Sequence, residues 1–455
     1  MPTPADCASG PPQLTNDGRT VAKCTEVPSA TAQLCPLRAP GVCAPRSEPA
    51  RPRSDEAANV RPGTPLRHPT PAGLGSHRPR HGGRSIATSV GVVFGGPSAE
   101  HDVSVITGLQ ATHSLAESGH DVVALFWSKI GEWWQVDPLA ETAAFADGVP
   151  NGAEQLRFSL GVDAGFARKR SGLRKATLDL DVIVNACHGG AGEDGTLQAL
   201  LDLAGIPYTG PTRSSASLAM DKLAFASLLE SRNLRRLPRI SYADAVDRSP
   251  DFPAPYIVKP RYGGSSIGTQ VVEDEAALAA LIEHGAHMRD GAVVEPFLPD
   301  SIDLNVGLRR FPDLQVSAIE RPLRNAELSP ILGYADKYTS TEGMADAPRE
   351  LPADLPEQLA EELRTSALVV GAQLPVRGVA RLDFLLDGSD LYVNELNTIP
   401  GSFAKYLWIE PTVPFEQLLQ DMIAEAKARP TYRPVTEGAD GSILRDAGSI
   451  AAKLH

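Results

Sequence analysis

Two short motifs carry oxygen-bearing side chains at a spacing that suits a divalent metal ion. Arg381 and Asp383 lie two residues apart in RLDF, and Glu395 and Asn397 lie two apart in NELN. Residues two apart on a strand point to the same face of a sheet. Two adjacent strands could thus present Asp383, Glu395 and Asn397 together, an all-oxygen set that suits Mg²⁺ bridging phosphates. The alternative is a sheet face salt-bridged around Arg381.

A second motif suits the binding of phosphate. In YIVKPRYGGSSIG, Lys259 ends an apolar strand directly before a glycine-rich loop. Glycines let backbone N–H groups approach an anion closely, and a lysine adds a compact positive charge. The alternative is a tight hairpin with a surface lysine. Lys222 lies in a stretch over 214–230 that predicts a helix, and it could supply a second charge or remain a solvated helix lysine.

Alternating strands and helices must position these motifs. Apolar runs at 89–96, 120–127 and 180–190 predict strands, two of which end in glycines, with a helix after Ser98. This alternation indicates a parallel α/β sheet whose ligands bind beyond the carboxyl ends of its strands. Later segments predict further strands at 256–268, 292–298, 304–310, 378–386 and 391–397. A helix is predicted at 414–428.

Composition and charge limit the class of protein. The 455 residues suffice for two or three domains, and the net charge of −13 argues against bulk binding to nucleic acid. No apolar run is long enough to span a membrane, and we see no secretory signal, so the expected location is the cytoplasm. Four of the five cysteines lie in a polar segment rich in proline and match no zinc pattern: Cys7, Cys24, Cys35 and Cys43.

The chain divides into five predicted parts. Residues 1–86 are rich in Pro, Ala, Ser, Arg and Gly and are expected to be disordered, because they cannot bury enough apolar surface to offset their ordering entropy. We place an N-terminal substrate domain at 87–211, a central lid domain at 212–300 and a catalytic domain at 301–430. A flexible tail is expected at 431–455.

Seven motifs in order resemble those of D-alanine–D-alanine ligases: FGGPSAEHDVS, HGGAGEDGTLQALLDLAGIPYTG, MDK, IVKPRYGGSSIG, ADKYTS, RLDF and NELNTIPG. The resemblance covers about Ser89 to Lys427. It implies an α/β, three-domain ATP-grasp fold with an N-terminal Rossmann-like parallel sheet. It also implies ATP as co-substrate between the last two domains, Mg²⁺ as cofactor (two ions, with Mn²⁺ possible), small-molecule substrates such as D-alanine, and a homodimer.

The resemblance assigns roles around the nucleotide. Lys222 and Lys259 would contact the phosphates of ATP, and Glu295 and Leu298 would lie on the adenine side. Asp303 falls where the family usually has a ribose-binding glutamate that is one methylene longer. Asp383, Glu395 and Asn397 would hold the metal ions.

The resemblance also assigns roles around the first amino acid. Glu100 would bind its ammonium group, with His188 nearby. Ser265 and Tyr338 would complete a hydrogen-bonded triad with Glu100 that fastens an ω-loop over the site, at 333–341. Lys337, from the same loop, would reach the transferred phosphate.

For the joining step, the resemblance places Arg381 and the backbone N–H of Gly401 at the tetrahedral oxyanion. The family often has small and hydroxyl residues after NTIPG, one of which helps to bind the second carboxylate. Here the corresponding sequence is SFAKYLW, with Lys405 and Tyr406 near the position of that residue. Lys405 could pair with a carboxylate, or the bulky residues could reshape the pocket. Two alternatives stay open: a dipeptide ligase for other amino acids in specialised metabolism, and a non-catalytic nucleotide-binding protein.

Overall fold

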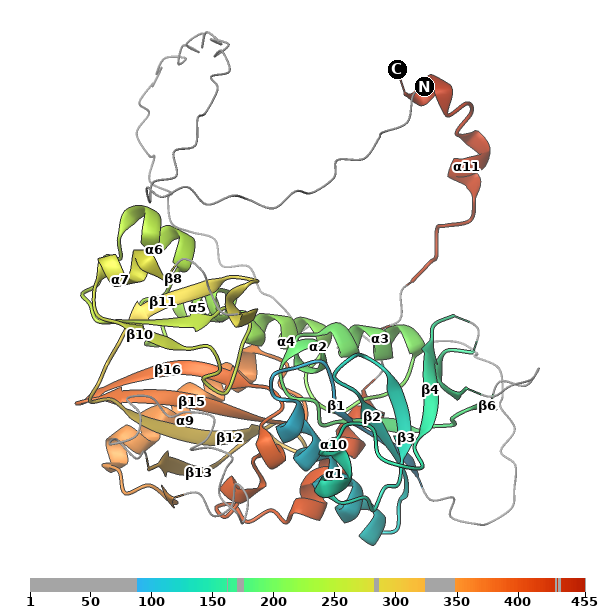
Figure 1. Cartoon of the computed structure of the whole chain (residues 1–455), viewed down its shortest axis with the longest axis horizontal. Coiled ribbons are helices and arrows are strands. Elements are labelled where there is room, and N and C mark those ends of the chain that lie inside the picture. The colour runs from blue at the N-terminus through green and yellow to red at the C-terminus, as the bar shows by residue number, and fades with distance from the viewer. Residues whose placement is uncertain are drawn as a thin grey trace, which may run out of the picture. The chain divides into compact units, whose positions relative to one another are not determined.

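The computed structural model describes residues 88–161, 163–169, 176–281, 286–323, 348–429, 432 and 435–454. The predicted disordered segment 1–86 with its four cysteines, and the ω-loop 333–341 with Lys337 and Tyr338, lie outside the described residues. Within the described residues the strands form three sheets, which Figure 1 colours in chain order from blue-green through yellow to orange. The first part contains both strands and helices, in agreement with the α/β prediction.

The first sheet has the strand order β6-β5-β4-β3-β2-β1-β7. Its parallel part is β1 (Ser89–Gly95) between β2 (Asp121–Trp127) and β7 (Val182–Asn185), which are the three predicted strands. Four short antiparallel strands extend one edge, so the sheet is mixed and not parallel throughout. Their shortness left no apolar run to detect in the sequence: β3 (Trp133–Val136), β4 (Glu154–Ser159), β5 (Gly165–Arg168) and β6 (Ala176–Thr177).

Helices cover both faces of the parallel strands. Alternate residues of β1 point to opposite faces, so Val92 packs in one core cluster and Val93 in another. The first cluster includes residues of α1 (His101–Glu117) and α10 (Phe415–Ala428), although these helices are some 300 residues apart in the sequence. The second includes α3 (Thr196–Ala204), which follows the short α2 (Gly190–Glu193). Only a short turn joins the carboxyl end of β1, at Gly95, to the start of α1 at His101.

The second sheet is antiparallel and carries the glycine-rich loop. Its order is β10-β9-β11-β8, and residues 261–269 join β9 to β10. A separate core containing Tyr256, Val258 and Leu278 lies under this sheet. The elements of this part are β8 (Ile240–Ser241), α6 (Tyr242–Arg248), β9 (Tyr256–Pro260), β10 (Gln270–Val272), α7 (Glu275–Ala280), η2 (Ala286–Met288) and β11 (Ala292–Pro296).

The helix predicted over 214–230 is two helices, α4 (Arg213–Met220) and α5 (Lys222–Ser231). The chain leaves the helical conformation at Asp221, where ψ is 102°. The Asp221 carboxylate accepts hydrogen bonds from the N–H groups of Leu223 (3.0 Å) and Ala224 (3.3 Å), so it caps the start of α5. Lys222 is therefore the first residue of a helix, and its side chain is buried rather than solvated.

The third sheet carries the oxygen-bearing motifs. Its order is β14-β13-β12-β15-β16, all antiparallel, with Leu304, Leu382 and Phe384 in a core that includes α9 (Glu357–Gln373). The predicted strands at 304–310, 378–386 and 391–397 correspond to β12, β15 and β16. The strands are β12 (Ile302–Arg309), β13 (Gln315–Pro322), β14 (Arg349–Glu350), β15 (Val379–Asp387) and β16 (Asp390–Asn397), and η4 (Gly401–Leu407) follows.

The remaining described elements are short. A turn of helix, η1 (Thr142–Phe145), precedes β4, and the segment predicted as a tail contains α11 (Ser442–Asp446) and η5 (Ala451–Lys453). Among the residues that the structure describes, no helix combines the length and the apolar character that a membrane span needs.

Close packing at one glycine fixes α1 against β1. A Cβ atom added to Gly108 would lie 2.2 Å from the Cβ of Phe94, far inside van der Waals contact. The helix can approach the strand this closely because residue 108 has no side chain. This contact sets the position of α1, and with it the position of Glu100 at its start.

We predict that Gly108→Ala destabilises the protein. Alanine favours a helix by about 1 kcal/mol over glycine, but overpacking a core costs about 1–3 kcal/mol, so the net effect is a loss. The melting temperature should fall by roughly 1–2 °C for each kcal/mol lost, because the unfolding entropy of a chain of this size is large. Glu117→Ala, at an exposed position of the same helix, is the control and should change little. An unchanged melting temperature for Gly108→Ala would contradict the packing argument.

Candidate functional site

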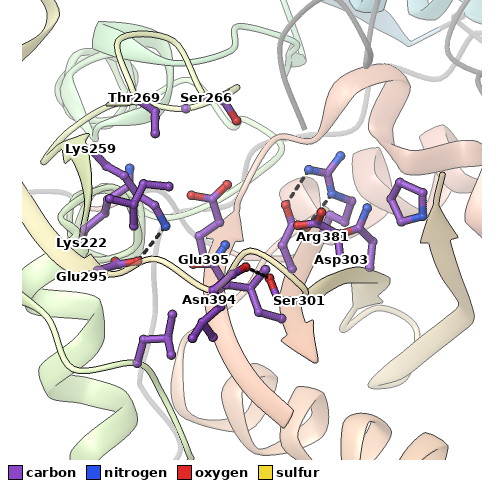
Figure 2. A pocket seen from close by; sticks show the side chains of 18 of the residues that line it. Lys222, Lys259, Ser266, Thr269, Glu295, Ser301, Asp303, Arg381, Asn394 and Glu395 are labelled. Carbon is purple, nitrogen blue, oxygen red and sulfur yellow. Dashed lines mark hydrogen bonds and ion pairs between the residues drawn. The ribbon is translucent and has the colours of Figure 1, made fainter. Parts of the chain in front are cut away.

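Residues of the second and third sheets line one cavity. Lys259 and Glu295 come from the second sheet, and Asp303, Arg381 and Asp383 come from the third. Figure 2 shows Lys222, Lys259 and Glu295 on one side of this cavity and Arg381 and Asp303 on the other, with Glu395 between them. The cavity thus brings together both predicted lysines, two of the three predicted metal ligands and the predicted nucleotide residue Leu298.

The lysine of the glycine-rich motif is paired with a buried carboxylate. Lys259 Nζ lies 2.7 Å from Glu295 Oε2, and Arg239 Nε donates to Glu295 Oε1. Glu295 is fully buried, which by itself would raise its pKa, but Arg239 and Lys259 lower the pKa to about 2. Glu295 is therefore an anion that holds two cations. Its predicted contact with adenine stays a prediction.

Lys222 is tied to the glycine-rich loop. Its Nζ donates to the carbonyl oxygen of Gly263, and burial lowers its pKa. A second link joins the same two segments, because Arg261 donates to both oxygens of Asp221 at 2.8 and 2.6 Å. Two positive side chains, Lys222 and Lys259, are thus held at the rim of a loop whose backbone could approach an anion.

The predicted metal ligands lie on one face of the third sheet. Asp383 and Glu395 are opposite each other on β15 and β16, as are Arg381 and Asn397. Asp383 accepts from Arg381 Nε (2.6 Å) and Nη2 (2.7 Å), and from Asn397 Nδ2 (3.0 Å). The salt-bridged face and the oxygen set, which the sequence offered as alternatives, are therefore both present.

The donor set is compatible with Mg²⁺ bound to phosphates. No group of three or more His, Cys, Asp or Glu residues with metal-binding geometry occurs among the described residues. The predicted ligand set consists of two carboxylates and one amide oxygen, from Asp383, Glu395 and Asn397. Mg²⁺ is commonly held by one or two carboxylates, while substrate phosphates and water complete its octahedron. The set therefore suits an ion that arrives with a nucleotide better than one held by the protein alone.

The polar face continues across the sheet to residues that sequence reasoning missed. Asn305 lies opposite both Asp383 and Glu320 in register. Glu320, which is buried, accepts from Asn305 Nδ2 (2.9 Å) and from Arg349 Nη1 (2.7 Å). Glu395, Asp383, Asn305 and Glu320 thus form a polar row over four strands. No motif predicted this row, because its members come from four separate parts of the sequence.

Glu100 lies at the start of α1, against two glycine-rich turns. It accepts a hydrogen bond from Ser265 Oγ, so this part of the predicted triad is in contact, while Tyr338 lies outside the described residues. A Cβ on Gly189 would lie 2.4 Å from Glu100 Oε2, and one on Gly264 would lie 2.9 Å from it. The carboxylate therefore fits between two turns that only glycine allows to come this close.

His188 and Gly401 lie beside Glu100. A small pocket is lined by Glu100, His188, Arg381 and Gly401, all of which were predicted to handle the amino acids. His188 Nε2 lies 2.8 Å from Thr107 Oγ1, and burial lowers the pKa of His188 to about 4. The imidazole is therefore neutral near pH 7. Arg381 also lines the larger cavity, so it connects the two spaces.

Lys405 and Tyr406 point in different directions. The ammonium of Lys405 lies 4.8 Å from the centre of the Phe415 ring, a cation–π contact away from the other predicted site residues. Tyr406 lines the large cavity with Arg381, and the guanidinium of Arg349 lies 4.3 Å from its ring. Burial raises the pKa of Tyr406 to about 12. Of the two residues, Tyr406 is the one placed to shape the cavity.

Glu193 is a further residue that the sequence left without a role. Its carboxylate accepts from Gly189 N, Thr398 Oγ1 and Ile399 N, each at 2.9 Å. It thereby joins the glycine turn beside Glu100 to the turn that follows β16. Burial, followed by the nearby charge of Glu100, raises the pKa of Glu193 to about 7. Only its place in the GEDG motif could have drawn attention to it.

Comparison with known proteins agrees with this arrangement. Residues 89–211 match a family model described as the D-ala D-ala ligase N-terminus, and residues 230–424 match the corresponding C-terminus. A D-alanine–D-alanine ligase of Mycobacterium sp. (strain KMS) is 31% identical over 368 residues, which cover 76% of this chain and 98% of that protein. The chain belongs to the D-alanine–D-alanine ligase family. This family comprises ATP-dependent ligases.

Other relatives agree with the assignment to this ligase family. The D-alanine–D-alanine ligase of Thermosipho africanus (strain TCF52B) is 29% identical and covers 74% of this chain and 93% of its own. The solved D-alanyl-alanine synthetase A of Vibrio cholerae superposes with a TM-score of 0.62 at 20% identity, over 76% of this chain and 100% of its own. The solved D-alanine–D-alanine ligase of Helicobacter pylori superposes with a TM-score of 0.59 at 24% identity, over 74% of this chain and 99% of its own. These two structures show that the predicted α/β fold is correct.

We predict that Glu193 makes stability fall as the pH rises. Its folded-state pKa, about 7, is above the ordinary value of 4.5, so the folded state binds this proton more tightly than the unfolded state. The stabilisation is complete below about pH 4.5 and is lost as the pH rises to about 7.

The melting temperature of Glu193→Gln relative to wild type should therefore rise between pH 4.5 and pH 8, measured on ligand-free protein. Glu117→Gln, which changes an exposed carboxyl, is the control. A difference between Glu193→Gln and wild type that does not vary with pH would rule out the raised pKa.

Proposed function

We propose that this protein joins two D-alanines in an ADP-forming reaction through an acyl phosphate, to supply a precursor of peptidoglycan. The observation that carries the proposal is the position of Arg381, which lines both the cavity with the two lysines and the pocket with Glu100 and His188. A site that couples a nucleotide to an amino acid needs such a connection. From the family relationship we further propose that the protein is an ATP-grasp enzyme, that it is located in the cytoplasm and that it acts as a homodimer.

The large cavity would bind the nucleotide. Lys222 and Lys259 would neutralise its phosphates, and Leu298 and Glu295 would lie near the base, with Asp303 near the ribose. Bound Mg²⁺ would withdraw charge from the phosphates and so reduce their repulsion of an incoming carboxylate. Asp383, Glu395 and Asn397 would supply oxygen ligands for it.

In the first step the protein orients one amino acid for phosphorylation. Glu100 would bind its ammonium group, which leaves the carboxylate directed toward the γ-phosphate. A carboxylate oxygen forms a bond to the γ-phosphorus, the bond to the β-phosphate oxygen breaks, and ADP leaves. The two lysines would favour this step because two anions must meet in it.

In the second step the ammonium group of the second amino acid releases one proton to solvent, and the resulting amine attacks the acyl carbon. The nitrogen gives up a second proton, the bond from that carbon to the phosphate oxygen breaks, and inorganic phosphate leaves. Arg381 and the N–H of Gly401 are proposed to stabilise the tetrahedral oxyanion, a contribution that typically amounts to about 3 kcal/mol for one donor. The acyl phosphate hydrolyses if water enters, so a covering loop is chemically required. Lys337 and Tyr338 of the 333–341 loop stay predicted members of that cover.

A second candidate keeps this chemistry with a different second amino acid. Tyr406 favours it, because its large, partly buried ring, with Glu320 and Arg349 beside it, takes up space on the wall that carries Arg381. A non-catalytic nucleotide-binding protein would have no need to place Arg381 between two pockets.

The choice of substrate can be measured directly. Purified protein with Mg-ATP should release ADP only when D-alanine is present, and mass spectrometry should find D-alanyl-D-alanine. The same assay with a panel of D- and L-amino acids separates the two candidates. Exclusive formation of D-alanyl-D-alanine would eliminate the second candidate, whereas turnover only with another pair would eliminate the first.

We predict that Lys259→Met lowers kcat/KM for ATP by roughly 100-fold or more, because it removes a positive charge from the phosphate site and leaves Glu295 with one partner fewer. The assay is initial-rate ADP release at varied ATP. Lys169→Met removes a lysine that hydrogen-bonds Gln155 at the edge of the first sheet, and it should leave kcat/KM unchanged. Equal kinetics for Lys259→Met and wild type would refute the role of Lys259.

A further inference from the structure

One buried arginine outside all the motifs contacts three segments that carry the proposed nucleotide site. Arg239 lies between α5 and β8, and its side chain is 4% exposed. Its Nε donates to Glu295 on β11. Its Nη1 donates to the carbonyl oxygen of Lys222 at 2.8 Å, and its Nη2 to that of Asn394 on β16 at 3.2 Å. Glu295, Lys222 and Asn394 all line the large cavity, and Asn394 is followed directly by Glu395.

Each contact has a direct consequence for one charged side chain. The carboxylate of Glu295 holds Lys259 Nζ, so fixing Glu295 also fixes Lys259. The carbonyl of Lys222 belongs to the first residue of α5, where a small shift of the backbone moves the whole lysine. Asn394 immediately precedes Glu395, so its carbonyl fixes the strand that carries this carboxylate. One guanidinium therefore connects both lysines and a metal-ligand strand.

Arginine is suited to this task in a way that lysine is not. Its guanidinium is planar and offers five donors in a fixed arrangement, whereas an ammonium group is a point charge on a flexible chain. Arg239 uses its three nitrogen atoms on three different partners. All three contacts are to protein groups, and Arg239 is not among the residues that line the large cavity. The side chain is therefore placed to hold other residues rather than to bind the nucleotide.

We propose that Arg239 is a positioning residue of the nucleotide site, which sets Lys259 through Glu295 and holds Lys222 and the Glu395 strand in register with it. This inference rests on the proposed function, because it assumes that the two lysines bind the phosphates of ATP. It assigns to Glu295 the role of a counter-ion for Lys259.

The test is the binding of a nonhydrolysable ATP analogue, β,γ-imido-ATP with Mg²⁺, measured by titration calorimetry without any amino acid. We expect Arg239→Met to weaken binding, with a dissociation constant at least tenfold higher than that of wild type. Arg239→Lys keeps the charge beside Glu295 but not the three-way contact, so its affinity should fall between those of Arg239→Met and wild type. The matched control is Arg236→Met, which removes a neighbouring, partly exposed arginine paired with the exposed Glu230 and should bind as wild type does.

A second measurement separates positioning from general loss of structure. If Arg239 acts largely through Lys259, then Arg239→Met should weaken binding by a clearly smaller factor in a Lys259→Met background than in the wild-type background. Equal factors in the two backgrounds would overturn the proposal. If Arg239→Met does not fold, Arg239→Lys in the same two backgrounds provides the comparison.

The outcomes also separate this inference from the proposed function. Wild-type protein that does not bind the analogue would refute the nucleotide site itself. Wild type that binds the analogue, together with a folded Arg239→Met variant of equal affinity, would refute only the role of Arg239. In steady-state kinetics of ADP release, the expected signature is a raised KM for ATP with an unchanged KM for the amino acid.

Discussion

The site depends on the mutual neutralisation of charges that are buried together. Glu295 is fully buried between Lys259 and Arg239, and Asp383 is buried against Arg381. Removing one partner of such a pair leaves an uncompensated buried charge, which costs several kcal/mol. Each buried carboxylate must therefore be brought into the site together with the cations that neutralise it. The same sets prepare the cavity for a polyanion, because its cations are already held on the walls that phosphates would approach.

Hydrogen bonds and apolar packing join distant parts of the chain around these charges. Glu193 receives hydrogen bonds from the turn after β7 and from the turn after β16, and α10 packs in the same core as β1. The first sheet and the third are thereby held on either side of Glu100 and Arg381. An amino acid bound at Glu100 would then lie next to the cavity whose nucleotide activates it. In the proposed mechanism, this shared wall would couple the two half-reactions.

The sequence predicted those parts of the site that lie in compact motifs. Lys259 beside its glycine loop, and Asp383, Glu395 and Asn397 at a spacing of two on strands, could be found because spacing alone decides which face they share. Arg239, Glu193 and Glu320 could not, since their partners are distant in sequence and each alone resembles an ordinary polar residue. The break at Asp221 was missed because a helical pattern runs through it, while the cap depends on one side chain. The antiparallel strands β3–β6 were missed because they are short.

The central claim is that a carboxylate is activated by transfer of the γ-phosphoryl group. It can be tested with D-alanine carrying ¹⁸O in both carboxylate oxygens, in a turnover with Mg-ATP, followed by mass spectrometry of the released phosphate. An acyl phosphate requires one ¹⁸O atom to leave with phosphate for each peptide bond made, so we predict one labelled oxygen in each phosphate. Phosphate without label, released in step with dipeptide, would contradict the account.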